Sequence, residues 1–338
     1  MENRKIKNDN QAKLFDLIQK EFPNKALVDI VSGILDISYD SAYRRIRGDM
    51  KISFEEAIKL SENFQISIDS FANVTRKNQI QCGYYPLDLS DPKDYLSFIQ
   101  SISDNIEKVQ KTPGSEIILS TVDVPLFNLF IHRELTFFKI FSWHKSIYGY
   151  NGNFETFVNE SETYESLIDL YEKIVKNYQL IPSSEIWTAN TIDTILRLIS
   201  YHVEMGHFST EDAPLRLCDQ LLILMDTLLS WAESGTKGPK NVPFKFYVSE
   251  TDIANTFILF KTPERSNCLL RLYTINGLSI SDESFCRETE SWLNNSIQRA
   301  SLISKTSEKE RHKFFNVKKQ KIRYVIQKIQ TEFKNHIV

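Results

Sequence analysis

The chain has 338 residues, of which 41% are hydrophobic and 25% are charged, a balance typical of a soluble globular protein with two or three domains. No apolar run is long enough to cross a bilayer, and the first residues, MENRKIKNDNQ, lack the apolar segment of a secretion signal. We therefore expect a cytoplasmic protein that makes no membrane contact.

The net charge of −3 is unevenly distributed. An acidic body at residues 78–304 lies between a near-neutral N-terminal part and a basic tail, and this body would repel a polyanion.

The 10 glycines do not cluster, which argues against a phosphate-cradling loop, and the four cysteines have no paired spacing, which favours free thiols. No Ser-His-Asp or Cys-His arrangement can be assembled from the sequence, so we expect no enzymatic activity, no metal and no cofactor.

Residues 1–74 predict a five-helix domain. Apolar residues at helical spacing, together with capping signals, place the helices at 10–21, 26–35, 38–48, 53–64 and 68–71. Ser38 is expected to cap the third helix and Gly48 to end it in the left-handed conformation. Ser53 and Glu56 form a capping box before the fourth helix. The second and third helices, separated by a short turn, predict a helix-turn-helix.

The rest of the chain predicts a linker followed by a larger body. Residues 75–93, with two prolines and a glycine, are expected to form the linker. Residues 94–235 predict a mainly helical body, with helices at 94–111, 161–180, 184–205 and 210–233 and a strand at 116–122. Residues 236–338 predict a small antiparallel sheet at 244–249, 256–261 and 268–274, followed by helices at 282–301 and 307–336. The expected fold class is mainly α, with a helical bundle followed by an α+β body that packs as one unit.

The third helix carries the chemistry that points to a partner. At 100° per residue, Ala42 and Ile46 face inward, and Arg45 lies on the flank. The outer face predicts contacts to DNA, because a short helix after a tight turn can enter the major groove. The candidate DNA-binding residues are Ser38, Tyr39, Asp40, Ser41, Tyr43, Arg44, Arg45, Arg47 and Lys51.

The individual side chains suit different parts of a duplex. Arg44 can bind guanine with two hydrogen bonds, and Tyr39 and Ser41 can reach bases or phosphates. Arg47 and Lys51, at the helix end and beyond it, are placed to neutralise phosphates. Asp40 can complement the helix N-terminus or accept a hydrogen bond from a cytosine amino group.

The segments ISYDSAYRRIRGD and ISFEEAIKLSENFQISIDSF resemble the Cro/phage-repressor (XRE-like) helix-turn-helix family, and most closely its BetR-like branch. The resemblance covers about residues 14–71 and implies a bacterial transcriptional regulator that binds specific DNA sequences. It further implies that Tyr39, Asp40 and Arg44 read bases and that Arg47 touches phosphate. Arg45 and Ile46 depart from the family pattern. The remainder more faintly resembles the C-terminal region of single-component bacterial regulators and implies no ligand.

Several alternatives remain open for the body. The basic tail, with an apolar stripe from Ile322 to Ile337, can dock on the acidic body, form a dimer contact or touch DNA. The aromatic-rich stretch at 127–154 can supply the core or line a pocket for a small-molecule effector. His202 and His207 lack the i,i+4 spacing that converges on a metal.

We expect double-stranded DNA and a second copy of the chain as partners, with a small-molecule or protein effector also compatible with the body. Dimerisation is inferred because one such helix buries too little surface to discriminate an operator. The competing hypothesis is a protein-interaction scaffold in which the N-terminal bundle binds protein and no DNA.

Overall fold

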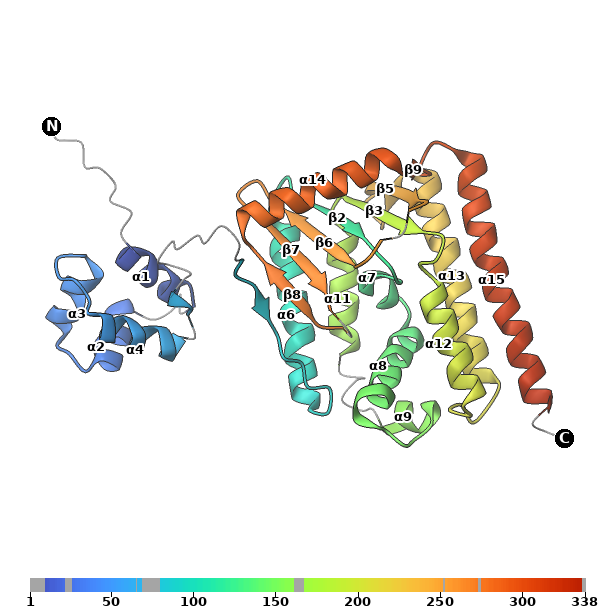
Figure 1. Ribbon diagram of the computed structural model, residues 1–338, viewed down its shortest axis with the longest axis horizontal. Helices are drawn as coiled ribbons and strands as arrows, with labels where there is room; N and C mark the ends of the chain where they lie inside the picture. Colours follow the sequence, from blue (N-terminus) through green and yellow to red (C-terminus); the bar gives the residue numbers. More distant parts are fainter. Residues whose placement is uncertain are drawn as a thin grey trace. The chain divides into compact units, whose positions relative to one another are not determined.

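The computed structural model describes residues 10–21, 26–64, 66–68, 80–160, 167–251, 253–272 and 275–335 (Figure 1). The chain divides into two compact units, residues 1–81 and 82–338. Of the described residues, 59% are helical, and the strands form a mixed sheet of nine. The fold is therefore broadly α+β, and the expectation of a mainly α protein was too narrow.

The N-terminal unit is a small helical bundle with its own core. Its helices are α1 (Asn10–Glu21), α2 (Leu27–Leu35), α3 (Tyr39–Ile46) and α4 (Phe54–Phe64). Leu14, Ile18, Val31, Ala42 and Leu60 are buried together. These helices match four of the five expected; most of the fifth, at 68–71, lies outside the described residues.

The second unit is built on the nine-stranded sheet. Its strands are β1 (Gly83–Tyr84), β2 (Glu116–Ser120), β3 (Ser183–Thr188), β4 (Thr236–Lys237), β5 (Val242–Ser249), β6 (Phe257–Lys261), β7 (Ser266–Arg271), β8 (Gly277–Ile280) and β9 (Ser301–Leu302). The order is β1-β8-β7-β6-β2-β3-β5-β4, and β9 pairs with β5. The central strands β2, β3 and β5 are parallel, and every other pairing is antiparallel.

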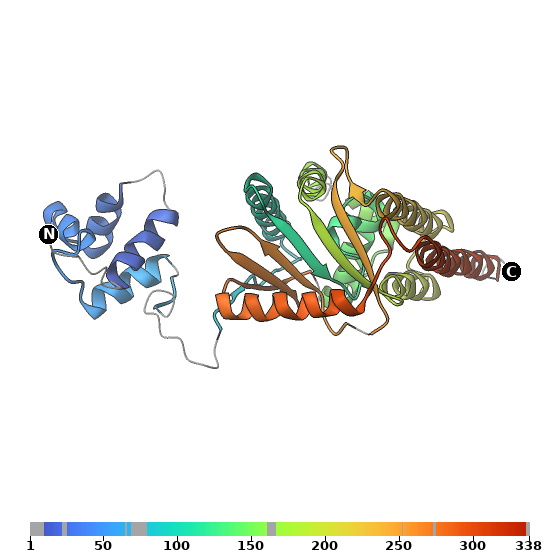
Figure 2. The same ribbon diagram turned by 90° about the horizontal axis from the view of Figure 1, so that it is seen from above.

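Helices cover both faces of this sheet. They are α6 (Pro92–Lys111), α7 (Leu126–Leu129), α8 (Arg133–Tyr148), α9 (Phe154–Glu160), α11 (Ile168–Gln179), α12 (Asp193–Glu204), α13 (Asp212–Ser234), α14 (Glu283–Arg299) and α15 (Glu308–Asn335). Figure 2 shows α14 on one side of the sheet and α6 and α11 on the other. The face toward α14 holds a compact cluster that includes Ile118, Ile186 and Leu293, and the opposite face holds the main core.

Three sequence-based expectations for this unit need correction. The predicted helix at 184–205 is strand β3 followed by helix α12. The predicted small antiparallel sheet is a larger mixed one, because β2 and β3 join β5 in parallel through crossovers that contain helices. The predicted linker at 75–93 reaches into the unit, since β1 pairs with β8 and α6 begins at Pro92.

Strand β3 was missed because it carries a buried carboxylate. Glu185 is 0% exposed, accepts a hydrogen bond from the Tyr178 hydroxyl, and accepts another from Trp187 Nε1 at 2.7 Å. Beside it, Lys237 Nζ donates to the Ser183 hydroxyl at 2.6 Å and lies 3.3 Å from the centre of the Tyr178 ring. Burial raises the pKa of Glu185 and holds the pKa of Lys237 well below its usual value.

The basic C-terminal helix α15 docks on the acidic body. Ile322 and Ile329 are buried in the main core. Its lysines form ion pairs with acidic residues of α12 and α13; these pairs are Lys319 with Asp226, Lys321 with Asp193, and Lys328 with Glu204. Docking on the body was one of the three alternatives for this segment, and Ile337, the last residue of its apolar stripe, lies outside the described residues.

A buried histidine makes the second unit sensitive to acid. His202, on α12, lies with its Nδ1 2.8 Å from His207 Nδ1 and its Nε2 3.1 Å from the Ser142 hydroxyl. Burial lowers the pKa of His202 to about 4, below the value of roughly 6.5 for an unfolded histidine. The unfolded chain therefore takes up this proton first, and acid favours unfolding.

We expect the free energy of unfolding of the second unit to fall by about 3 kcal/mol through His202 between pH 7 and pH 4. Urea denaturation followed by tryptophan fluorescence measures this, since the chain's four tryptophans, at 143, 187, 231 and 292, all lie in that unit. His202→Gln, which does not titrate, should show a shallower pH dependence than the parent. An equally steep loss in the variant would contradict the assignment.

Candidate nucleic-acid interface

Helix α3 is bounded on both sides by tight, specific turns. Asp36 adopts a left-handed conformation with φ of 56° at the end of α2, where its backbone N–H bonds to the Ser32 carbonyl. Ser38 then caps α3 by accepting a hydrogen bond from the Ser41 backbone N–H at 3.3 Å. Gly48 follows the helix with φ of 80°, which suits glycine because it lacks a Cβ. Both caps predicted from the sequence are confirmed.

The capping box of α4 is also present. The Glu56 backbone N–H donates to the Ser53 hydroxyl at 3.1 Å, and the Ser53 backbone N–H donates to the Glu56 carboxylate at 2.9 Å. This reciprocal pair satisfies donors that a helix N-terminus leaves without partners. It also fixes the Glu56 carboxylate in a position from which it can meet α3.

Arg45 forms an ion pair with that carboxylate. Its Nη2 and Nε lie 2.8 Å and 3.1 Å from the two Glu56 carboxylate oxygens, and its Nη1 donates to the Ser41 carbonyl at 3.2 Å. The side chain is only 14% exposed, and its hydrogen bonds lower the pKa of Glu56. Arg45, expected among the DNA-binding residues, is thus occupied inside the fold, where it joins α3 to α4.

Gln11 holds the segment that follows α3. Its side-chain amide donates to the Arg45 carbonyl at 2.6 Å and to the Met50 carbonyl at 2.9 Å, and accepts from the Ile52 backbone N–H at 3.1 Å. The side chain is buried. Sequence reasoning missed this role, because the bonded groups are backbone atoms 34 to 41 positions away and leave no residue pattern.

The outer face of α3 remains exposed. Tyr39, Asp40, Tyr43, Arg44 and Arg47 all face solvent, and Lys51 is exposed in the following segment. Helical spacing places the five residues of α3 and its end on the face opposite Ala42 and Ile46; the cap Ser38 is also exposed, and Ser41 is half-buried. The sequence-based division of α3 into inner and outer faces is therefore confirmed, although the structure does not test what the outer face binds.

Local contacts pre-position several of these side chains. The Tyr39 hydroxyl donates to Asp29, and this hydrogen bond raises the pKa of the phenol. Arg47 Nε lies 3.5 Å from an Asp49 carboxylate oxygen, and its guanidinium lies 5.6 Å from the centre of the Tyr43 ring. Arg44 forms no ion pair with any residue that the structure describes.

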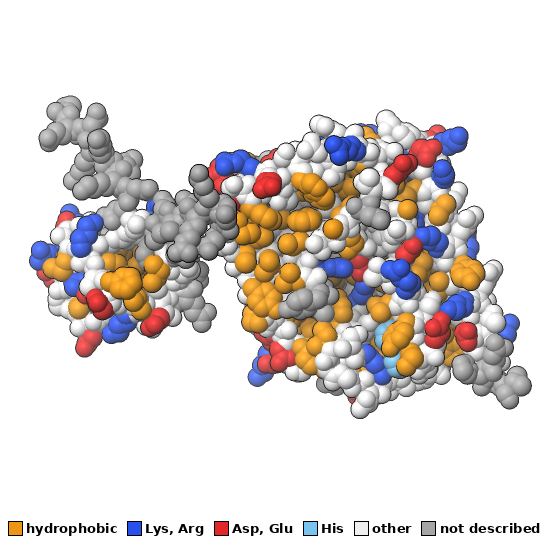
Figure 3. Space-filling view, in the orientation of Figure 1, with side chains coloured by type: hydrophobic (Ala, Val, Ile, Leu, Met, Phe, Trp, Pro, Cys, Tyr) orange, Lys and Arg blue, Asp and Glu red, His pale blue; other side chains and the backbone are white. Residues whose placement is uncertain are grey.

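The charge around α3 is mixed. Arg45 is matched by Glu56 and Arg47 by Asp49, whereas the Arg44 guanidinium has no acidic partner among the residues that the structure describes. Figure 3 likewise shows basic and acidic side chains interspersed on the visible face of the N-terminal unit. Any affinity for a polyanion would therefore come from a few placed cations rather than from a broad basic surface.

Other candidate sites from the sequence have plain structural roles. The aromatic stretch at 127–154 is largely core, with Phe127, Phe138, Phe141 and Phe154 buried, and the void beside α8 measures only about 10 Å³. Within the described ranges, no three His, Cys, Asp or Glu residues are grouped to hold a metal ion. None of the described helices is long and apolar enough to span a membrane.

Comparison of the chain with protein-family models, curated proteins and solved structures gave no match.

The two neighbouring arginines should differ in their effect on stability. Arg45→Ala should lower the free energy of unfolding of the N-terminal unit by about 1–2 kcal/mol, because it leaves the half-buried Glu56 without its partner. Arg44→Ala, a matched change one residue away on the exposed face, should have little effect. Hydrogen exchange of backbone amides in residues 26–64 of the full chain measures both. Equal protection in the two variants would contradict the structural role of Arg45.

Proposed function

We propose that the N-terminal unit binds double-stranded DNA with sequence preference, and that the protein is a cytoplasmic bacterial transcriptional regulator rather than an enzyme. The observation that carries the proposal is the exposed outer face of α3, on which Arg44 has no ion-pair partner among the described residues. The inner side of the same helix is held in place by the ion pair between Arg45 and Glu56. A preorganised helix lowers the entropy lost on binding.

The dimensions and chemistry of α3 fit the major groove. The groove is about 12 Å wide and admits one α-helix. Arg44 lies in the middle of the exposed face and can bind O6 and N7 of guanine with two parallel hydrogen bonds. Tyr39 is held in place by Asp29, so little side-chain freedom is lost when its ring meets a base.

Phosphate contacts would flank this base contact. Arg47 is exposed at the C-terminal end of α3, and its 3.5 Å contact with Asp49 is long for an ion pair, so a phosphate can compete for it. Ser38, Ser41 and Lys51 add hydroxyl and ammonium groups around the helix. Arg45 is not part of the proposed set of contacts. If it turned toward DNA, the half-buried Glu56 carboxylate would lose its ion-pair partner.

The two exposed arginines should separate specificity from general affinity. Arg44→Ala should cost about 1–3 kcal/mol at the preferred sequence and reduce discrimination, whereas Arg47→Ala should weaken binding to all duplexes and lower the salt slope. Fluorescence anisotropy with a selected site and a scrambled duplex at several salt concentrations measures this. If both variants bind the selected site as the parent does, α3 is not the reading element.

We further propose that two copies bind together. A single short helix contacts few base pairs, and paired half-sites about 34–36 Å apart double the contacted sequence. Sites selected by the full chain from random DNA should therefore show two related half-sites with a fixed spacing. A single unrepeated motif bound at one chain per duplex would contradict this.

Protein binding is the second candidate function, and exposed aromatic residues favour it. Phe54 is 67% exposed at the start of α4, and Tyr39 and Tyr43 are exposed on α3. Such rings are enriched in protein interfaces. Salt-dependent retention on duplex DNA distinguishes the two functions, because phosphate contacts weaken steeply with salt. No retention at about 50 mM salt would favour the protein-binding alternative.

A further inference from the structure

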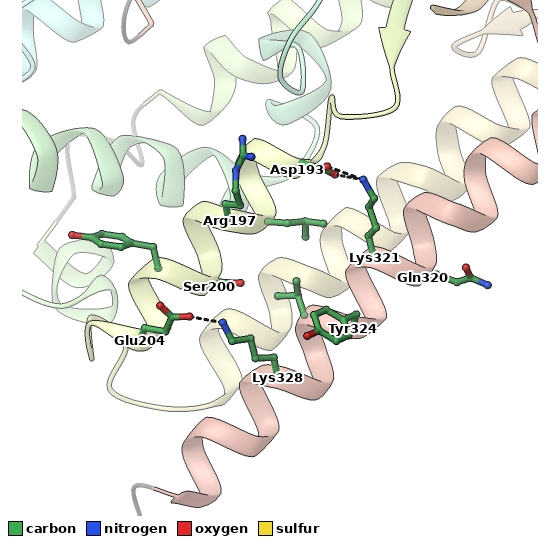
Figure 4. Close-up of a pocket in the computed structure, with 11 residues that line it drawn as sticks. Asp193, Arg197, Ser200, Glu204, Gln320, Lys321, Tyr324 and Lys328 are labelled. Atoms are coloured by element: carbon green, nitrogen blue, oxygen red, sulfur yellow. Dashed lines mark hydrogen bonds and ion pairs between the residues drawn. The ribbon is translucent and has the colours of Figure 1, made fainter. Parts of the chain in front are cut away.

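A cleft of about 640 Å³ lies on the surface of the second unit, between helices α12 and α15 (Figure 4). Its origin is the way α15 docks. This helix packs most extensively against α13 and less against α12, so long side chains bridge the remaining gap to α12. The cleft has the volume of a small-molecule site, for which about 300–1,000 Å³ is usual.

Two ion pairs cross the cleft, one at each end. Lys321 Nζ lies 2.7 Å from an Asp193 carboxylate oxygen, and Lys328 pairs with Glu204. Figure 4 shows these pairs joining α12 to α15, with Ser200 directed from α12 toward α15 between them. Each carboxylate of the cleft is therefore already matched by an ammonium group.

The surface between the ion pairs is largely apolar. Leu196 from α12 and Val325 from α15 form its buried floor. Tyr201 and Tyr324 also line it, and the Tyr324 side chain is 69% exposed. Exposed rings above an apolar floor leave a surface that an apolar or aromatic molecule can cover.

Arg197 adds a charge that the cleft does not match. It lines the cleft and is exposed, and it has no ion-pair partner in the described part of the chain. It projects from α12 near the end where Asp193 meets Lys321. With Lys321 and Lys328 matched by Asp193 and Glu204, one surplus positive charge remains, on a unit that is otherwise rich in acidic residues.

We propose that this cleft binds a small amphipathic monoanion, a carboxylate carried on an aromatic or aliphatic body. Arg197 binds the carboxylate with two parallel hydrogen bonds, and the apolar body lies over Leu196 and Val325 against Tyr324. A carboxylate fits better than a phosphate monoester, which carries about −1.5 to −2 at neutral pH against one surplus positive charge. This site is independent of DNA binding by the N-terminal unit.

The position of the cleft in the fold supports a ligand site. Helix α12 follows strand β3, so the end of the cleft at Asp193 lies just beyond the carboxyl end of a central parallel strand. Ligands of open α/β sheets commonly bind beyond such strand ends. Lys318 anchors α15 there by donating to the carbonyls of Thr188 and Ala189, which keeps that end of the cleft in place.

The test is a calorimetric titration of the full chain with three carboxylates: benzoate, indole-3-acetate and octanoate. Benzamide, which is neutral, and phenyl phosphate, which carries more charge, are the matched probes. At least one carboxylate should bind with one-to-one stoichiometry and a Kd of about 1 mM or below. Arg197→Ala should weaken it about tenfold, the effect of losing hydrogen bonds to a charged group. Ser200→Trp should block the cleft, and Arg299→Ala, the same charge change at an exposed position on α14, should leave binding unchanged.

Four results would overturn the proposal. The first is that no carboxylate binds saturably. The second is that binding is the same in Arg197→Ala as in the parent, whatever the effect of Ser200→Trp, since Arg197 is exposed and its loss should not impair folding. The third is that benzamide binds as tightly as benzoate, which would remove the role of the charge. The fourth is that phenyl phosphate binds more tightly than benzoate, which would overturn the choice of a carboxylate.

Discussion

The second unit depends on the burial of one carboxylate at the centre of its sheet. Glu185 has no access to water, so every lone pair must find a donor in the protein. Those donors come from separate elements: Tyr178 at the end of α11, Trp187 on β3 itself, and Asn128 of α7 at 3.5 Å. Lys237 of β4 adds a buried amino group beside them. Satisfying this single group therefore constrains the packing of two helices and an edge strand around β3.

The N-terminal unit uses the same principle on a smaller scale. Its apolar core is small, and buried or half-buried polar side chains fix the parts that the core does not reach. Gln11 binds three backbone groups around the end of α3, and Arg45 binds Glu56. In both units, buried polar groups fix how neighbouring elements pack, around α3 in one and around β3 in the other, and polar groups of this kind specify one arrangement among several that apolar packing would allow.

Sequence reasoning succeeded where the signal is local and failed where it is not. The caps at Ser38 and Ser53 and the two faces of α3 depend on residues within one or two turns, so their spacing reveals them. The prediction for strand β3 was wrong because Ser183, Ser184 and Glu185 resemble the start of a helix. The Glu185 carboxylate can be buried in a core only because side chains of other elements donate hydrogen bonds to it. Arg45, placed on the flank of α3 and counted among the DNA-binding candidates, was misjudged because its partner Glu56 lies on the next helix. The cleft at α12 arises from docking of α15, which no local pattern encodes.

The separation of roles within α3 has a consequence for how such a protein diversifies. Ala42, Ile46 and Arg45 serve the fold, whereas the side chains of Asp40, Tyr43 and Arg44 contribute little to it. Mutations at the second group are therefore close to neutral for folding, and duplicated genes can explore new combinations there without passing through unfolded intermediates. Arg45 and Glu56, in contrast, must be inherited together, since losing one leaves the other with unmet hydrogen bonds.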